Sequence, residues 1–208
     1  FATFFQEGML TLLNNANRTW QLPMGIFAQS IGIAMLPTLS AHHAAKDYDS
    51  FRELFYKGIR IITLISLPIA ALMLLANDQI MRLLFKWGSS PEADVYYGGI
   101  ALMGYSASLL FASVVGVTIR AFYAMQDSIT PLVGGVVGLV LNYLFNVLFH
   151  NFTDLGIAGT ALAYTFTILW SMLFLLTIFS KKTGFRIFSD NMKFLAKSFA
   201  ALDRKSVV

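Results

Sequence analysis

The chain has 208 residues, of which 57% are hydrophobic and only 12% are charged, and its formal net charge is +4. Globular domains hold about 25% charged residues, so this composition excludes an ordinary soluble domain of this length. Cysteine is absent, which excludes a disulfide framework and a thiolate metal site.

Five apolar blocks are long enough to cross a bilayer, and their continuous pattern predicts helices because lipid cannot satisfy an open backbone. They cover residues 9–39, 61–77, 95–119, 128–149 and 155–180. We therefore predict an all-α fold, a polytopic transmembrane helical bundle. Residues 1–184 are expected to form one lobe of about five spans, preceded by the tail of an earlier span. Because the chain does not begin with methionine, we expect a piece of a longer protein.

The first block carries a polar stripe around its one charged residue. Asn14, Arg18, Gln21 and Gly25 are spaced by four, three and four residues, so they share one helix face. A charge at bilayer depth is costly unless it faces a polar cavity, and a planar guanidinium can bind two phosphate oxygens at once. We expect these side chains to line a cavity. The alternative is that Arg18 only reaches toward the headgroups.

Pro23 follows the stripe inside the same block. A proline inside a helix removes a backbone hydrogen bond and bends the helix. We expect Pro23 and Gly25 to form a hinge. The alternative is an ordinary packing kink.

Two stretches outside the blocks are amphipathic. In residues 51–60 and again in residues 188–202, large apolar side chains recur at helical spacing beside basic ones. Both patterns predict helices that lie in the membrane interface. For the final segment, residues 185–208, the alternative is a further span of which only the start is present, followed by an unpatterned tail.

The basic residues predict the orientation of the spans. Most of them fall in the connections after the first, third and fifth blocks. The positive-inside rule places these connections in the cytoplasm and the loop at residues 77–94 outside.

Polar residues also occur in the last two blocks. Asn142 and Asn146 are an i, i+4 pair, and Thr160, Thr165 and Thr167 offer hydroxyl groups on the following block. The amides either ligate a cation or hydrogen-bond to another helix, and the second use is the more frequent. Three glycines, Gly134, Gly135 and Gly138, contain a small-xxx-small pattern that predicts close helix packing. The sequence shows no serine–histidine–acid set and no phosphate-binding glycine loop, so we expect a protein that is not an enzyme.

Three motifs follow one another in order. Residues 14–27 read NNANRTWQLPMGIF and residues 35–40 read MLPTLS, residues 120–131 read RAFYAMQDSITP, and residues 156–163 read GIAGTALA. These resemble the MurJ/MviN family of lipid II flippases, in which the corresponding patterns are YADRLYQLPLGIFG…LLPxLS, RAFYAxxDxxTP and GxAGLALA. The resemblance extends over about residues 1–182.

The resemblance implies the two-lobe fold of the multidrug/oligosaccharidyl-lipid/polysaccharide exporter superfamily. This chain would be much of the second lobe, and its N-terminal lobe would be a partner outside the sequence. Arg18 matches the arginine that the family uses for the substrate pyrophosphate, whereas the family's acidic residue before it is Asn17 here. Some relatives hold sodium in this lobe, and Asn142, Asn146 and Thr165 occupy comparable places. We expect no other cofactor.

The expected function is to flip a lipid-linked peptidoglycan precursor, lipid II, across the bacterial inner membrane by alternating access, in cell-wall biogenesis. The expected partners are an undecaprenyl-pyrophosphate-linked substrate and membrane lipids, with no nucleic acid. Two alternatives stay open: export of a drug or of another polyprenyl-linked sugar, and a membrane scaffold for cell-wall synthesis that transports nothing.

Overall fold

The computed structural model describes residues 9–85, 92–152 and 156–184, and every regular element in these ranges is a helix. The elements are α1 (Met9–Pro23), the π-helical segment η2 (Met24–Gln29), α2 (Ser30–Ala44), α3 (Tyr48–Leu75), α4 (Asn77–Phe85), α5 (Glu92–Ala124), α6 (Ile129–Phe152) and α7 (Gly156–Thr183). The predicted all-α bundle is confirmed. The predicted tail of an earlier span and the segment 185–208 lie outside the described residues.

Five stretches are long and apolar enough to cross a membrane, which confirms the predicted number of spans. They are Leu13–Ala44, Tyr48–Leu75, Tyr96–Ala124, Ile129–Asn151 and Ala158–Thr183. The first runs through α1, η2 and α2 without a break. The chain is therefore a multi-pass membrane protein.

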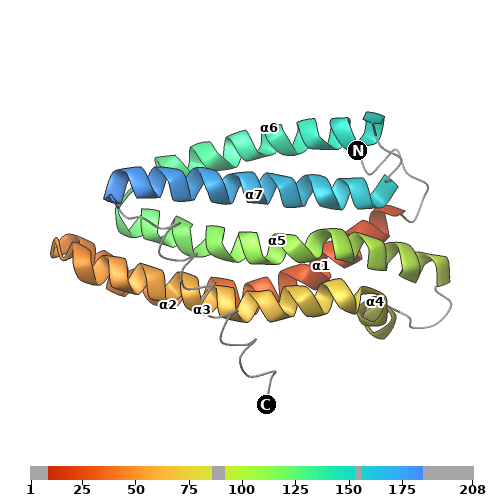
Figure 1. The fold of residues 1–208 in the computed structure, drawn as a ribbon, viewed down its shortest axis with the longest axis horizontal. Helices are drawn as coiled ribbons and strands as arrows, with labels where there is room; N and C mark the ends of the chain where they lie inside the picture. Colours follow the sequence, from red (N-terminus) through yellow and green to blue (C-terminus); the bar gives the residue numbers. More distant parts are fainter. Residues whose placement is uncertain (1–8, 86–91, 153–155, 185–208) are drawn as a thin grey trace, which may run out of the picture.

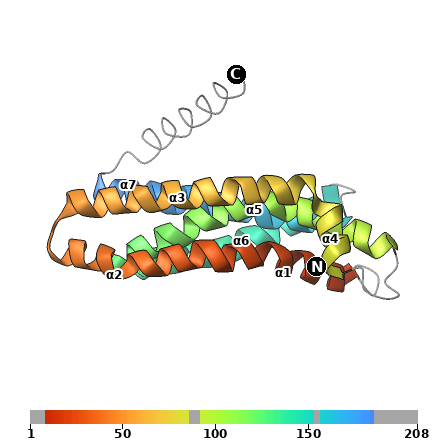
Figure 2. The same cartoon turned by 90° about the horizontal axis from the view of Figure 1, so that it is seen from below.

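The long helices lie side by side with α5 at the centre (Figures 1 and 2). Helix α5 contacts α1, η2, α2, α3, α4 and α7, whereas α6 lies at the edge of the bundle and packs mainly on α7. The burial of the spans follows this arrangement: α5 is the most buried and α6 is the least.

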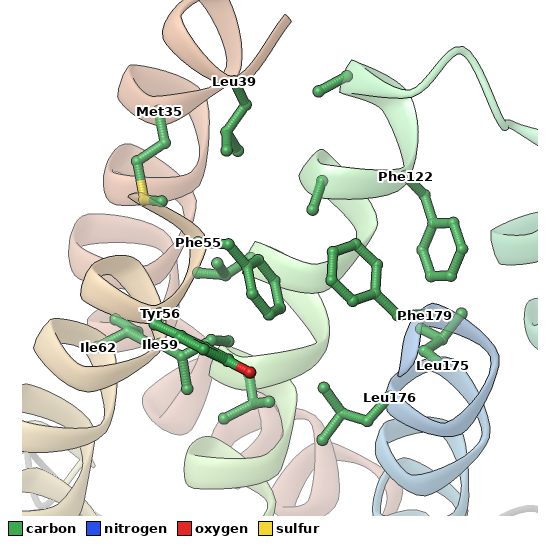
Figure 3. Close-up of a cluster of buried hydrophobic side chains, with 14 of the residues drawn as sticks. Met35, Leu39, Phe55, Tyr56, Ile59, Ile62, Phe122, Leu175, Leu176 and Phe179 are labelled. Atoms are coloured by element: carbon green, nitrogen blue, oxygen red, sulfur yellow. The ribbon is translucent and has the colours of Figure 1, made fainter. Parts of the chain in front are cut away.

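The interfacial helix predicted at residues 51–60 is wrong, because this stretch forms the first turns of the span α3. Phe51 and Phe55 are fully buried against Phe179 of α7, and the Phe55 and Phe179 rings stack with centroids 4.4 Å apart (Figure 3). Phe122 of α5 meets Phe179 edge to face at 5.5 Å. Offset and edge-to-face aromatic pairs of this kind add about 0.5–1.5 kcal/mol each beyond their buried area. The apolar side of the amphipathic pattern therefore meets protein and not lipid.

The predicted loop at residues 77–94 is also wrong in part. Its first residues form α4, in which Arg82 donates a hydrogen bond of 2.7 Å to Asp78 one turn earlier. Met81 of α4 is buried next to Gly98 of α5, where only the absence of a side chain leaves room for its methyl group. This contact packs α4 onto the central helix.

The α2–α3 turn and the α5–α6 turn are built alike, and both lie at the end of the bundle where α7 also ends (Figure 1). In each, a left-handed residue follows the helix, Lys46 (φ 57°) or Gln126 (φ 59°), and the next residue donates its N–H to the carbonyl five residues back. This is the Schellman arrangement that satisfies helix-end carbonyls. The following aspartate then caps the next helix: Asp47 accepts from the Ser50 N–H and Asp127 from the Thr130 N–H.

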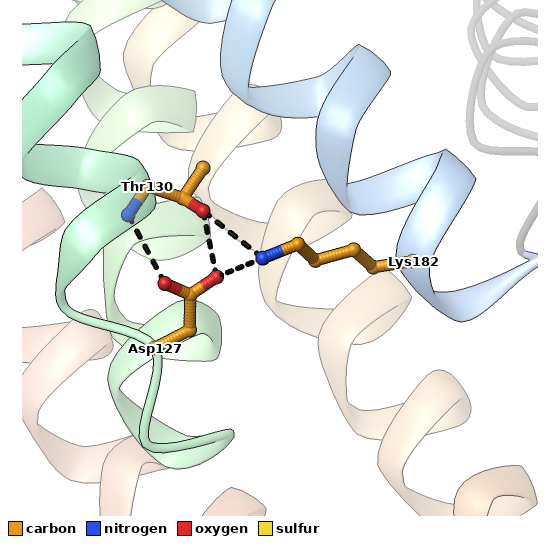
Figure 4. Close-up of polar contacts among 3 residues, drawn as sticks. All are labelled: Asp127, Thr130 and Lys182. Atoms are coloured by element: carbon orange, nitrogen blue, oxygen red, sulfur yellow. Dashed lines mark hydrogen bonds and ion pairs between the residues drawn. The ribbon is translucent and has the colours of Figure 1, made fainter.

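Asp127 also joins two spans. Its carboxylate accepts hydrogen bonds from the Thr130 hydroxyl at 2.7 Å and from Lys182 Nζ at the end of α7 at 2.5 Å (Figure 4). Partial burial raises the pKa of this carboxyl group, but the hydrogen bonds from Lys182 and Thr130 outweigh it and hold the pKa at about 2. The carboxylate is therefore charged at any physiological pH.

Candidate functional site

The predicted polar stripe lies on the uncovered face of α1. Asn14, Arg18 and Gln21 are exposed, and so is Gly25 in η2, where a Cβ atom would meet nothing within 4 Å. Leu13, Ala16 and Trp20 lie on the opposite face and are buried. The helix therefore turns an apolar face to its own lobe and a polar face away from it, and the shared face predicted from the spacing is confirmed.

Trp20 anchors this part of α1. Its ring is 1% exposed and packs against Tyr105 of α5 at 6.3 Å and Tyr164 of α7 at 5.5 Å. Tyr105 lies nine residues inside the span that begins at Tyr96, which is about 14 Å at 1.5 Å per residue. Arg18 precedes Trp20 by two residues and is therefore held at a depth well inside the bundle.

Asn17 orients the neighbours of Arg18, a role that the sequence did not predict. Its side-chain oxygen accepts hydrogen bonds from Trp20 Nε1 at 2.8 Å and from Gln21 Nε2 at 2.9 Å. The i, i+3 and i, i+4 spacing was the only available signal. A carboxylate, which the family pattern has at this position, would accept the same two hydrogen bonds.

Arg18 itself makes no hydrogen bond or ion pair with any residue in the described ranges. Buried or membrane-depth cations usually have a partner, so an unpaired guanidinium is available to an anionic ligand. Asn14 and Gln21 add polar atoms on the same face. The stripe can therefore bind a phosphate-like group if a second surface closes over it.

After the stripe, the helix changes to the π-helical segment η2, which follows Pro23 directly and which the sequence did not predict. Single π-helical turns often occur at functional sites. At its end, the side-chain Oε1 of Gln29 accepts a hydrogen bond of 2.6 Å from Arg120 Nη2 of α5, and the aliphatic part of Arg120 lies against Gly32. A hinge motion at Pro23 and Gly25 stays a prediction.

The structure does not bring the three predicted sodium ligands together. Asn142 donates to the Thr167 hydroxyl at 3.3 Å, and Asn146 donates to both oxygens of Asn142, at 2.8 and 3.2 Å. Thr165 instead donates to the Gly104 carbonyl of α5 at 2.7 Å, because it lies on a different face of α7 from Thr167. The interhelical hydrogen bond that the sequence favoured is therefore confirmed. The residues present do not converge their oxygens on one point, and sodium binding stays a prediction.

The three glycines of the small-xxx-small motif in α6 do not all face the same neighbour. Gly134 and Gly138 face α7, where added Cβ atoms would lie 3.1 Å from Phe174 and 3.4 Å from Ser171, so the predicted close packing is confirmed for this pair. Gly135 faces open space. Within the described ranges, no group of three or more His, Asp or Glu residues is placed to hold a metal.

Comparison with known proteins agrees with this architecture. The profile of the family described as "Lipid II flippase MurJ" matches residues 1–204. The chain is 32% identical over 163 residues to the probable lipid II flippase MurJ of Vibrio cholerae serotype O1, covering 78% of this chain and 30% of that protein. It is 31% identical over 163 residues to the protein of the same name from Haemophilus influenzae, covering 76% and 32%. The chain thus spans about a third of the length of these relatives.

Two solved structures share the fold. One is a lipid II flippase MurJ in an inward closed conformation, with a TM-score of 0.77, 20% identity, and coverage of 96% of this chain and 42% of that one. The other is a multidrug resistance MATE family transporter of the MOP superfamily in an inward-facing conformation, with a TM-score of 0.73, 18% identity, and coverage of 87% and 40%. Because the family profile matches almost the entire sequence, the chain belongs to the lipid II flippase MurJ family.

Proposed function

We propose that the protein containing this lobe flips lipid II across the bacterial inner membrane by alternating access. The uncovered polar stripe carries the proposal. An unpaired Arg18, flanked by Asn14 and Gln21, lies on a membrane helix whose polar face no described residue covers. The relatives are bacterial proteins of this name, which supports the inner membrane as the location.

The stripe requires a second surface, because a polar face at this depth is costly against lipid. The matched part of this chain covers only 30% and 32% of these two relatives, so the rest of such a protein can supply that surface. A cavity between the two parts would then hold the pyrophosphate on Arg18, while the polyprenyl tail stays in the bilayer. Fixed cations in a cavity shielded from water bind an anionic group more strongly than they do in bulk water.

Complementation of a flippase-depleted strain by the full-length protein tests the role of Arg18. We expect Arg18→Ala to abolish complementation while the protein still inserts at normal abundance, because the substrate loses its cationic partner. Arg18→Lys keeps the charge but loses the planar fork, so it should restore growth only in part.

Arg82→Ala is the matched control. Arg82 lies in α4 and pairs with Asp78 within its own helix, so its loss should leave growth unchanged. Full growth of the Arg18→Ala strain would show that the stripe does not bind the substrate and would reject the proposal.

A further inference from the structure

A groove runs along α6 on the side that faces α5. Its deeper part is a hollow of about 310 Å³ between α5, α6 and α7. Its shallower part, about 670 Å³, lies toward the start of α6. Ile119, Pro131, Gly135 and Leu139 line both parts, so the two are continuous.

The groove exists because α6 is attached to the bundle on one side only. Gly134 and Gly138 bring α6 close to α7, whereas α6 barely touches α5. Gly135 points into the remaining gap, where a Cβ atom would meet nothing within 4 Å. A glycine inside a helix costs about 1 kcal/mol relative to alanine, and Gly135 gives no helix packing in return.

The walls of the groove are apolar, and polar side chains lie at its deep end. Ile119, Leu139 and Leu175 are typical of its lining, and Asn142 and Thr167, which are hydrogen-bonded to each other, lie at its deep end. From Ser128 at the shallow end to Asn142 is 14 residues, or about 21 Å of helix at 1.5 Å per residue. One leaflet contributes about 15 Å of hydrocarbon, so a groove of this length is long enough for an acyl chain that extends through a single leaflet.

The occupant must be thin and apolar. The deep part of the groove holds about 310 Å³, which is too little for a further helix about 10 Å across. The shallow end begins beside Asp127 and Lys182, where charged groups mark the end of the bundle and the level of lipid headgroups. We propose that this groove binds an acyl chain of a membrane phospholipid from the leaflet on the Asp127 side, and that the bound lipid fills the gap between α5 and α6.

Photolabelling of the full-length protein in phosphatidylethanolamine–phosphatidylglycerol vesicles tests the proposal. The probe is a phospholipid with a diazirine on its acyl chain, and labelled peptides are identified by mass spectrometry. We expect preferential labelling of Ile119 and Leu139. Gly135→Leu places a side chain in the open space and should reduce this labelling about tenfold, which corresponds to about 1.4 kcal/mol.

Val140→Phe is the matched control, because Val140 is an exposed α6 residue that does not line the groove. It should leave the labelling unchanged, and Gly135→Ala should give an intermediate value that confirms the trend in a minimally altered protein. Equal labelling of the wild type and Gly135→Leu would overturn the proposal, as would uniform labelling of all exposed α6 positions. Displacement of the probe by undecaprenyl phosphate but not by excess phospholipid would assign the groove to an isoprenoid and overturn the phospholipid assignment.

Discussion

The candidate site contains two supporting residues, Trp20 and Asn17, and one residue available for a ligand, Arg18. Trp20 is buried between Tyr105 and Tyr164 and fixes the rotation of α1. Asn17 accepts the indole N–H that would otherwise be buried without a partner. Arg18 is left pointing away from the lobe with no partner among the described side chains. The direction of the guanidinium therefore follows from packing two residues away.

The role of Asn17 can be measured by substitution. Asn17→Ala leaves the buried Trp20 N–H without an acceptor, which costs about 1–3 kcal/mol, so the apparent melting temperature in detergent should fall. Asn17→Asp keeps an acceptor and should melt close to the wild type. If Asn17→Ala and Asn17→Asp melted alike, the hydrogen bond to Trp20 would not be what holds the ring.

Asp127 gives a pH-dependent prediction. Its pKa is about 2 in the folded protein and about 3.9 in an unfolded chain, so its contribution to stability is complete above the unfolded value and is lost as pH falls through the folded value. Asp127→Asn should lower stability by about 1 kcal/mol near pH 7, while an asparagine still caps α6.

The difference in melting temperature between Asp127→Asn and the wild type should be constant from about pH 8 to pH 5 and shrink below about pH 4. A difference that changed between pH 8 and pH 5 would point to another titrating group.

At the scale of helices, the glycines of α5 show how one span serves as the centre of the bundle. A Cβ atom on Gly104 would lie 2.7 Å from the Cβ of Ala161 in α7, and the Gly104 carbonyl accepts the Thr165 hydroxyl. Both contacts need the two backbones to approach closely. Small residues make such approaches possible in membranes, where van der Waals packing replaces the hydrophobic effect between helices.

Two glycines of α5, one tightly packed and one not, allow the contribution of close packing to stability to be measured. Gly104→Ala must push α7 away from α5, and overpacking of this kind costs about 1–3 kcal/mol. Gly116→Ala meets nothing within 4 Å and gains helix propensity, so it should be neutral or stabilising. Thermal unfolding of the two variants in the same detergent checks the contrast. Equal melting of both would show that the α5–α7 spacing is not rigid.

At the scale of the whole molecule, the two Schellman turns and the end of α7 lie together, and α4 lies at the other end of the bundle (Figure 1). The basic residues of the connections gather at the first of these ends, including Lys46, Lys181 and Lys182. This separation of charge is what the positive-inside rule requires of a cytoplasmic side.

The absence of cysteine makes this topology directly testable. In intact cells, a membrane-impermeant maleimide should label Gln79→Cys in α4 but not Lys46→Cys or Gln126→Cys. The two turn positions should be labelled only after the membrane is opened, because the positive-inside rule predicts that they face the cytoplasm. Labelling of Lys46→Cys in intact cells would invert the orientation.

The sequence by itself determined the properties that depend on one helix at a time. The number of spans and the shared face of Asn14, Arg18 and Gln21 both follow from the pattern of residues along a single segment. Three ordered motifs were enough to identify the family, and the profile match confirms it.

Only the tertiary structure decided which neighbour each face meets. Residues 51–60 pack into the aromatic core. Thr165 hydrogen-bonds to α5, whereas Thr167 hydrogen-bonds to Asn142. Gly135 faces open space, whereas Gly134 and Gly138 face α7. In these cases, helical periodicity gives the direction of a side chain relative to its own axis. The identity of the partner depends on how distant segments pack, and an apolar pattern is the same whether it meets lipid or another helix.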